Sequence, residues 1–334
     1  MSQPSVLQGG RTRRGGLRRG TRGRRGVVFL LLGALLTLAF LLTLMAARAT
    51  GPERSALRPR VQTRLPAPAI RPTYGSVMAP AAEQVHSRQT FHLASGILFD
   101  VWTGRILWAH NPGRRLPIAS LTKMMTALLV LERARPTDQV LITRQAVHFS
   151  GSGVGLLPLG KRVRLLTLLY GLLLPSGNDA AIALAQHVAG SETNFVKLMN
   201  ARAQQMQLGC THFASASGLI DRDNYSCTTD LAVLAHSVLE QPLLSRIVGS
   251  RFAILPFPIK GGHLFLWNNN PLLIMRYPGT DGVKTGYTNA SGPCLVAAAR
   301  RGHAWLGVVL LHSVNPAGQA IKLFNLGFAQ LGAR

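Results

Sequence analysis

Acidic residues and cysteines are both scarce in this sequence. Its 334 residues include 12 Asp and Glu against 37 Lys and Arg, which leaves a formal charge of +25. The three cysteines are too few for a disulfide-stabilised scaffold, and Cys210, Cys227 and Cys294 form no C-x-x-C redox or zinc pair. We expect buried apolar thiols, and because the count is odd, at least one of them is unpaired or forms an intermolecular bond. No metal site and no cofactor are predicted.

Other absences exclude whole classes of protein. Charged residues make up only 15% of the chain and hydrophobic residues 47%, which argues against a wholly disordered protein. Glycine shows no three-residue period, which argues against collagen. No internal repeat is visible. The length permits one or two globular domains with a sizeable core.

The first 47 residues combine a basic arm with a long apolar run. Eight arginines fall within residues 1–26, interleaved with glycine. Residues 27–47 carry no charge, and a helix of this length crosses a hydrocarbon core of about 30 Å. Because the arginines precede this run, we expect a basic cytoplasmic tail, a single transmembrane helix in contact with membrane lipid, and an extracytoplasmic remainder.

Two alternatives to this N-terminal interpretation stay open. The apolar region of a signal peptide is usually shorter, but Ala47-Arg48-Ala49 could serve as a cleavage site. An Arg/Gly-rich arm can also bind nucleic acid through its phosphates, but this arm lacks aromatic residues and precedes an apolar span, so no specific nucleic-acid partner is expected. Residues 48–88 contain six prolines and no sustained apolar period, which indicates a semi-extended linker.

The rest of the chain has the pattern of a globular domain. Two β-rich runs, residues 91–99 and 105–109, predict an antiparallel hairpin. Helical patterns follow, and strands return at residues 295–299 and 305–311. This order predicts an α/β fold, in which one antiparallel sheet is built from both chain ends and flanked by helices. The expected helices are residues 120–133, 165–173, 180–188, 192–207, 229–239 and 318–330.

The first candidate motif is Ser120-Leu121-Thr122-Lys123, at the start of an expected helix. Alone, it is equally typical of an N-cap serine followed by an ordinary lysine. Residues i and i+3 share a helix face, however, which places the Lys123 amine beside the Ser120 hydroxyl. A lysine whose pKa is lowered by burial can take the serine proton and create a nucleophile. Free N–H groups at the helix start can stabilise the resulting oxyanion.

The second candidate motif is Ser176-Gly177-Asn178, which precedes another expected helix. A capping turn explains this pattern as well, and the same spacing recurs at Ser313-Val314-Asn315. In the context of the first motif, Ser176 can relay a proton between Lys123 and a leaving amine. Asn178 can bind a substrate amide carbonyl.

The third candidate motif is Lys284-Thr285-Gly286. A charged strand end with a turn glycine is the simple explanation. As a binding site, Lys284 supplies positive charge and Thr285 can donate a hydrogen bond to a substrate carboxylate. Gly286 has no side chain, so a substrate backbone could lie flat along the strand.

In this order, the three motifs resemble those of the serine D-alanyl-D-alanine carboxypeptidases, the low-molecular-mass penicillin-binding proteins. The resemblance runs from about residue 96 to residue 328 and includes the stretch THFASASGLIDRDNYSCTTDLAVLA. It implies a catalytic domain over residues 89–330 with a β-lactamase/transpeptidase-like fold and a helical lobe. It also implies an enzyme of the bacterial cytoplasmic membrane that removes the terminal D-Ala from peptidoglycan pentapeptide stems and binds β-lactams covalently.

The resemblance also implies a role for each motif residue. Ser120 would form the acyl-enzyme, Lys123 would act as base, and Ser176 would relay the proton. The substrate would be held by Asn178 at a carbonyl, by Lys284 and Thr285 at a carboxylate, by Gly286 along its backbone, and by the N–H groups of Ser120 and Tyr287 at the oxyanion.

Two departures from the family pattern bear on the substrate. Relatives often carry an arginine near the end of the penultimate strand-like run, where this chain has Leu311-His312-Ser313. The loop at residues 150–160 is also unusually rich in glycine and leucine. A D,D-endopeptidase on crosslinks, or a catalytically weak wall-binding or β-lactam-binding protein, therefore stays an alternative. A secreted β-lactamase is disfavoured because no glutamate lies in a suitable loop between Asn178 and Lys284. Many relatives carry a further domain and membrane helix at the C-terminus, and we expect the N-terminal span to anchor this chain instead.

Overall fold

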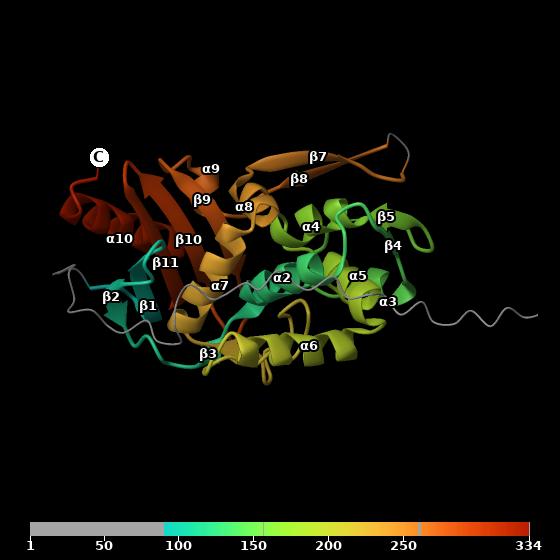
Figure 1. Cartoon of the computed structure of the whole chain (residues 1–334), viewed down its shortest axis with the longest axis horizontal. Coiled ribbons are helices and arrows are strands. Elements are labelled where there is room, and N and C mark those ends of the chain that lie inside the picture. Colours follow the sequence, from blue (N-terminus) through green and yellow to red (C-terminus); the bar gives the residue numbers. More distant parts are fainter. Residues whose placement is uncertain (1–89, 156, 260–261, 334) are drawn as a thin grey trace, which may run out of the picture. The chain divides into compact units, whose positions relative to one another are not determined.

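The computed structural model describes residues 90–155, 157–259 and 262–333 (Figure 1). The expected cytoplasmic tail, transmembrane helix and linker lie outside these residues. Within them, no single helix combines the length and hydropathy needed to cross a membrane. Only α7 (Thr228–Glu240) and α8 (Pro242–Gly249) taken together reach that length and composition, and they are bent by 103° where they meet.

One five-stranded antiparallel sheet organises the fold, in the order β2-β1-β11-β10-β9. The two ends of the domain meet in it, because β1 pairs along its length with β11. This confirms the predicted sheet built from both chain ends. The strands are β1 (Leu93–Asp100), β2 (Ile106–His110), β9 (Thr280–Gly286), β10 (Cys294–Arg301) and β11 (Ala304–Ser313).

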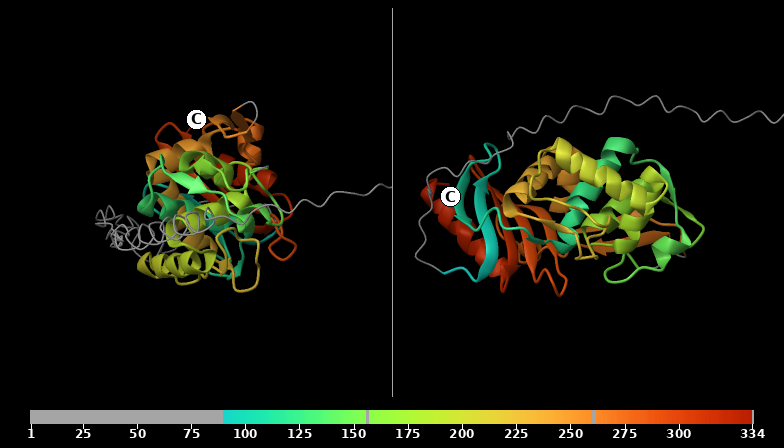
Figure 2. Two further views of the ribbon diagram at one scale, coloured as in Figure 1. Left: turned by 90° about the vertical axis from the view of Figure 1, so that its right-hand side faces the viewer. Right: turned by 90° about the horizontal axis from the view of Figure 1, so that it is seen from below.

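Both faces of the sheet are buried, as the strand sequences require. Ile97 and Phe99 belong to the large core on one face, whereas Leu98 between them belongs to a smaller core on the other. Successive side chains of a strand point to opposite faces, so continuous apolar runs mark a sheet covered on both sides. The long helix α10 (Pro316–Gln330) covers the smaller core, and the helical lobe covers the other face (Figures 1 and 2).

The helical lobe is the segment between β2 and β9. Its central helix, α2 (Lys123–Arg133), is almost entirely buried along its first eight residues and follows a 3-10 turn, η1 (Ala119–Thr122). Beside it lie α4 (Leu165–Leu173), α5 (Asn178–Ala189), α6 (Glu192–Gln205) and α7. The helix α3 (Arg144–Val147) packs against α5, and α8 packs against α4 and α7. The short helix α9 (Pro271–Ile274) packs instead against β9 and α10. Three two-stranded ribbons complete it: β3 (Leu116–Pro117) with β6 (Tyr225–Ser226), β4 (Gln139–Leu141) with β5 (Arg162–Arg164), and β7 (Phe252–Pro256) with β8 (His263–Trp267).

The predicted helices and strands are present, with boundaries that differ by at most three residues, and α4 has the predicted bounds. The helix expected from residue 120 begins instead as the tighter turn η1, and α5 begins at Asn178, two residues early. The sequence analysis missed α8 and the β7–β8 hairpin. Apolar side chains on both faces of β7 and β8 hide the alternation that marks a strand.

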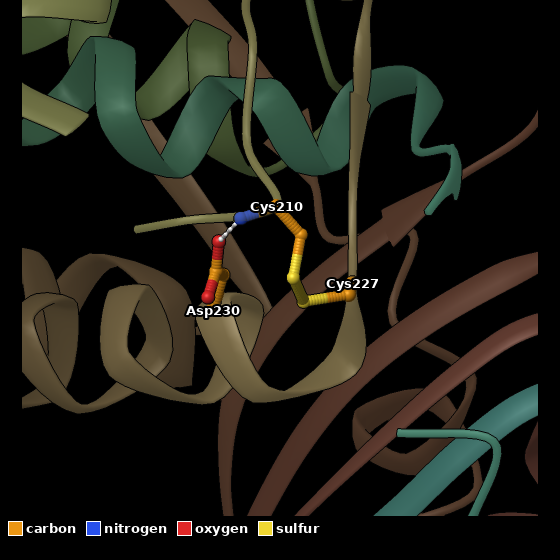
Figure 3. A group of neighbouring side chains, drawn as sticks. All are labelled: Cys210, Cys227 and Asp230. Carbon is orange, nitrogen blue, oxygen red and sulfur yellow. Dashed lines mark hydrogen bonds between the residues drawn. A yellow bond between two sulfur atoms is a disulfide. The ribbon is translucent and has the colours of Figure 1, made fainter. Parts of the chain in front are cut away.

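The expectation for the cysteines was wrong in part. Cys210 and Cys227 form a disulfide, and only Cys294 is a buried free thiol (Figure 3). Cys210 and Cys227 are 17 residues apart, and this spacing alone does not predict a disulfide. They meet because the chain between them turns back, so that His212 pairs with Tyr225. Asp230 lies beside the bridge, but the joined sulfurs offer no thiolate for a metal, and the carboxylate accepts from the Cys210 N–H and the Thr211 hydroxyl.

Candidate functional site

Ser120 and Lys123 meet where η1 passes into α2. The Lys123 amine lies 2.8 Å from Ser120 Oγ, as the i, i+3 spacing predicts, although the serine belongs to the 3-10 turn. Ala119 reaches this turn with φ of 47°, a left-handed conformation that a non-glycine residue adopts at a cost. The Ser120 side chain is half-buried, whereas that of Lys123 is fully buried.

The partners of Lys123 point the lone pair of a neutral amine at Ser120. Besides Ser120 Oγ, Nζ lies 2.7 Å from Asn178 Oδ1 and 2.6 Å from the Ser217 carbonyl oxygen. The amide of Asn178 is oriented by its own NH₂ group, which donates to the Ser150 carbonyl. Both oxygens can only accept, and a neutral amine has two hydrogens. Its lone pair is then left for the Ser120 hydroxyl, the one partner able to donate.

The two buried lysines of the site have different acidities. Burial is the main cause that holds the pKa of Lys123 well below its ordinary value. The positive charge of Lys284 lowers this pKa further, and the negative charge of Asp179 opposes the shift. Burial also lowers the pKa of Lys284, to about 7. Lys123 therefore suits a base, whereas Lys284 can still carry a proton near neutral pH.

The second motif lies at the amino end of α5. Ser176 has φ of 68°, and its buried hydroxyl has no hydrogen-bond partner within the described residues. No hydrogen bond joins it to Lys123 there, so its expected part in proton relay stays a prediction. Asn178 contacts Lys123 directly. By contrast, the similar Ser313-Val314-Asn315 is a helix cap, in which the Asn315 side chain accepts from the Gly318 N–H at the start of α10.

Asp179 is a residue of this site that the sequence analysis missed. It is buried in the first turn of α5, and its carboxylate accepts from the Val154 and Ala180 N–H groups. Burial raises the pKa of Asp179, and these hydrogen bonds oppose the rise. The contact with Val154 fixes the glycine-rich loop against the motif. An acid in the first turn of a helix was the available signal.

The third motif forms the end of β9, which packs against η1, the turn that carries Ser120. A Cβ atom at Gly286 would lie 3.0 Å from the Ile118 carbonyl oxygen and 3.2 Å from the Ser120 nitrogen. Glycine is thus needed here for the approach of β9 to η1, a reason other than the flat substrate backbone expected from the sequence. Lys284 is buried and donates to the Thr285 carbonyl, Thr285 is half-buried, and Tyr287 is exposed just beyond the strand.

The loop closed by the disulfide, residues 210–227, holds the same site from the other side. Its Ser217 carbonyl accepts from Lys123, and its Asn224 side chain pairs with Thr122. A Cβ at Gly218 would overlap the Ala119 carbonyl, so this position also requires glycine. Asp221 accepts from the Thr288 hydroxyl, just after the third motif.

No arginine is brought to the end of β9 by the register of the sheet. His312 lies at that end but one strand away, since β10 separates β11 from β9. Arg276 precedes β9 on the side of Thr280, and the strand from Thr280 to Gly286 is about 20 Å long at the usual rise per residue. The cations at the site in the described part of the chain are Lys123 and Lys284.

Comparison with known proteins identifies the family of the chain. The Peptidase_S11 family model, described as D-alanyl-D-alanine carboxypeptidase, matches residues 81–315. The chain is 34% identical over 244 residues to the D-alanyl-D-alanine carboxypeptidase DacF of Bacillus subtilis, covering 71% of this chain and 62% of that protein. It is 31% identical over 237 residues to a D-alanyl-D-alanine endopeptidase of Pseudomonas aeruginosa, covering 71% and 76%.

The fold is likewise similar to solved structures. A D-alanyl-D-alanine carboxypeptidase from Mycobacterium tuberculosis superposes with a TM-score of 0.69 at 31% identity, covering 75% of this chain and 95% of that one. The chain thus spans less than two thirds of the length of DacF but nearly all of this shorter relative.

Proposed function

Because the chain belongs to the D-alanyl-D-alanine carboxypeptidase family, which consists of serine-type enzymes, we propose that it removes the terminal D-Ala from peptidoglycan pentapeptide stems through an acyl-enzyme on Ser120. The observation that carries this proposal is the environment of Lys123. Its two carbonyl partners take the hydrogens of the neutral amine, and its lone pair faces the Ser120 hydroxyl at 2.8 Å. This is the arrangement a serine needs in order to lose its proton on attack.

In the proposed reaction, Ser120 Oγ attacks the carbonyl carbon of the penultimate D-Ala while its proton passes to Lys123. The N–H groups of Ser120 and Tyr287 would receive the oxyanion. Collapse breaks the peptide bond, and the leaving amine takes a proton through Ser176, whose hydroxyl has no other partner within the described residues. Water then hydrolyses the ester, returning Ser120 to its starting state. A β-lactam would follow the same first step, with its ring amide opened by Ser120.

The alternative of a D,D-endopeptidase rests on the carboxylate site. A terminal carboxylate needs cationic partners when it leaves water. Lys284 and Thr285 would supply this role, and the register of β10 and β11 brings no arginine of these strands to the end of β9. Loss of one charge-assisted hydrogen bond corresponds to about 10- to 150-fold in affinity. We therefore expect a weakened preference for free carboxylates over crosslinked, amide-extended stems.

The test measures both activities at two pH values. Purified full-length protein is incubated with a pentapeptide ending in D-Ala-D-Ala and with a matched crosslinked dimer, and mass spectrometry identifies the products. Protonated Lys284 binds the carboxylate, and its pKa of about 7 means that it is charged at pH 5 and about a tenth charged at pH 8. The ratio of kcat/KM for pentapeptide to that for dimer should fall about tenfold between them. Taking the ratio cancels the common effect of pH on Lys123.

Several outcomes would decide against parts of this proposal. Lys284→Arg keeps its charge, so a ratio that still falls with pH in this variant would assign the titration to a group other than Lys284. Cleavage of the dimer alone would make the protein an endopeptidase. If neither substrate is cut and no penicillin labels Ser120, the protein is a wall-binding relative.

The proposal includes an uncleaved N-terminal anchor in the bacterial cytoplasmic membrane, with the catalytic domain on the extracytoplasmic side. Its support is the 21-residue uncharged run preceded by eight arginines. Mass spectrometry of protein isolated from membranes should recover peptides from residues 2–26. A mature chain that begins near Thr50 would instead identify a signal peptide.

A further inference from the structure

The β7–β8 hairpin presents an apolar face to solvent. Its strands pair antiparallel, with Phe252 opposite Trp267 and Ile254 opposite Phe265. These four side chains point outward and are 60%, 64%, 52% and 55% exposed, respectively. We call this set the hairpin face. In Figure 1 the hairpin extends over α8 and α4 along one edge of the domain.

Packing within the domain does not account for the hairpin face. The opposite side of the ribbon already supplies the core contacts, through buried Leu264 and Leu266 and partly buried Ala253 and Leu255. Along a ribbon with one buried side, apolar residues on that side normally alternate with polar residues on the exposed side. A cluster of large exposed apolar side chains is instead typical of a surface that meets a partner or a membrane.

The segment that carries the hairpin face has charges of one sign, with Glu240 and Asp281 just outside it. From residue 241 to residue 280 the sequence has no Asp or Glu, but it has three arginines and one lysine. Arg251 is exposed immediately before β7. Aromatic rings beside basic groups, without carboxylates, match the interface of a bilayer that contains anionic lipid.

The expected N-terminal anchor also favours a membrane as the surface that the hairpin face meets. Its uncharged run at residues 27–47 is followed by 42 residues before the domain begins at residue 90. At about 3.1 Å per residue, the expected semi-extended linker reaches at most about 130 Å, so the domain stays within that distance of the membrane that holds the run. This step rests on the proposed anchor.

We propose that the hairpin face docks onto an anionic phospholipid surface. Phe252, Ile254, Phe265 and Trp267 enter the interfacial layer, and Arg251 meets lipid phosphates. The base of the hairpin is joined to the site, since the Asn269 backbone N–H and side chain donate to the Leu174 and Pro175 carbonyls, beside Ser176. Docking would therefore fix the orientation of the catalytic groups relative to the membrane.

The experiment uses the tryptophans of the full chain. There are four, at 102, 108, 267 and 305, and none lies in residues 1–89, so an inserted anchor contributes no tryptophan signal. Full-length protein is reconstituted into nanodiscs of phosphatidylcholine and phosphatidylglycerol with brominated acyl chains, which quench nearby tryptophan. We expect bromolipid-dependent quenching that is largely lost in Trp267→Phe and kept in Trp102→Phe, where the removed side chain is similarly exposed but distant in sequence.

A second pair of variants keeps Trp267 and alters its surroundings. Phe265→Ser and Arg251→Gln should each reduce the quenching, whereas Leu141→Ser on β4, also an exposed apolar position, should leave it unchanged. Quenching that persists in Trp267→Phe would overturn the proposal. Equal quenching in discs of phosphatidylcholine alone would also overturn it, because the lipid charge would then have no effect. An absence of quenching, together with another protein bound to the hairpin face, would overturn it as well.

The same samples separate docking from the earlier proposals. Vesicle flotation of the wild-type chain tests the anchor, and fluorescent penicillin tests the acylation of Ser120. Trp267→Phe should float and acylate like wild type, because Trp267 belongs to neither the anchor nor the site. A chain that floats and acylates without bromolipid quenching would contradict docking alone.

Discussion

Replacing Lys123 by alanine should slow acylation of Ser120 by about 10²- to 10⁴-fold, the usual contribution of general-base assistance. Among the described residues, the Lys123 amine is hydrogen-bonded to Ser120 Oγ at 2.8 Å, and its two carbonyl partners leave its lone pair available. The substitution also leaves Asn178 Oδ1 and the Ser217 carbonyl without this donor, so about 1–3 kcal/mol of stability should be lost for each. Stopped-flow labelling with a fluorescent penicillin measures the acylation rate.

Two controls separate the loss of a base from the loss of the fold. Ser120→Ala gives the blank, because it removes the nucleophile and leaves Lys123 in place. Circular dichroism and thermal unfolding should show a folded Lys123→Ala protein with a lowered Tm. Acylation of this variant at nearly the wild-type rate would show that another group, such as Lys284, takes the proton.

Removal of the disulfide should cost about 3 kcal/mol, the value for a closed loop of this size. For a domain of this length, the Cys210→Ser/Cys227→Ser variant should unfold about 6–12 °C lower than wild type. Acylation should also slow, because the loop between the cysteines carries the Ser217 carbonyl that holds Lys123 and the Asn224 side chain that holds Thr122. Calorimetry and penicillin labelling report the two effects.

Cys294→Ala is the matched control for this experiment. It removes the buried free thiol, which lies on β10 outside the loop. Its acylation rate should equal that of wild type, and reductant should lower the Tm of this variant as it does that of wild type. If the double-serine variant keeps the wild-type Tm and acylation rate, the bridge stabilises neither the fold nor the site.

Much of the site could be predicted because its chemistry is local in sequence. Ser120 and Lys123 are three residues apart, so a single turn brings them together. Asn178 reaches Lys123 from 55 residues away, and its position was predictable only from the order of the motifs. The sheet was predictable because β1, β10 and β11 are continuous apolar runs.

The parts of the site that could not be predicted depend on backbone groups or on contacts between segments that lie far apart in the sequence. Ser217 acts through its carbonyl, which every residue has, so no side chain marks it. The disulfide needs a turn that brings residues 17 apart together, and spacing alone does not reveal it. The close approach of Gly286 to the turn that carries Ser120 depends on how two distant segments pack, and the sequence gives no sign of it.

The pairing of β1 with β11 constrains the time at which this domain can fold during synthesis. About 200 residues separate the two strands, which a ribosome adds in about 10–40 s. Over that interval β1 has β2 as its neighbour, and its other edge waits for a strand not yet made. Such long-range pairing is slow to form and leaves an open edge exposed to aggregation. Chaperones that bind extended apolar segments should therefore hold this chain until β11 emerges.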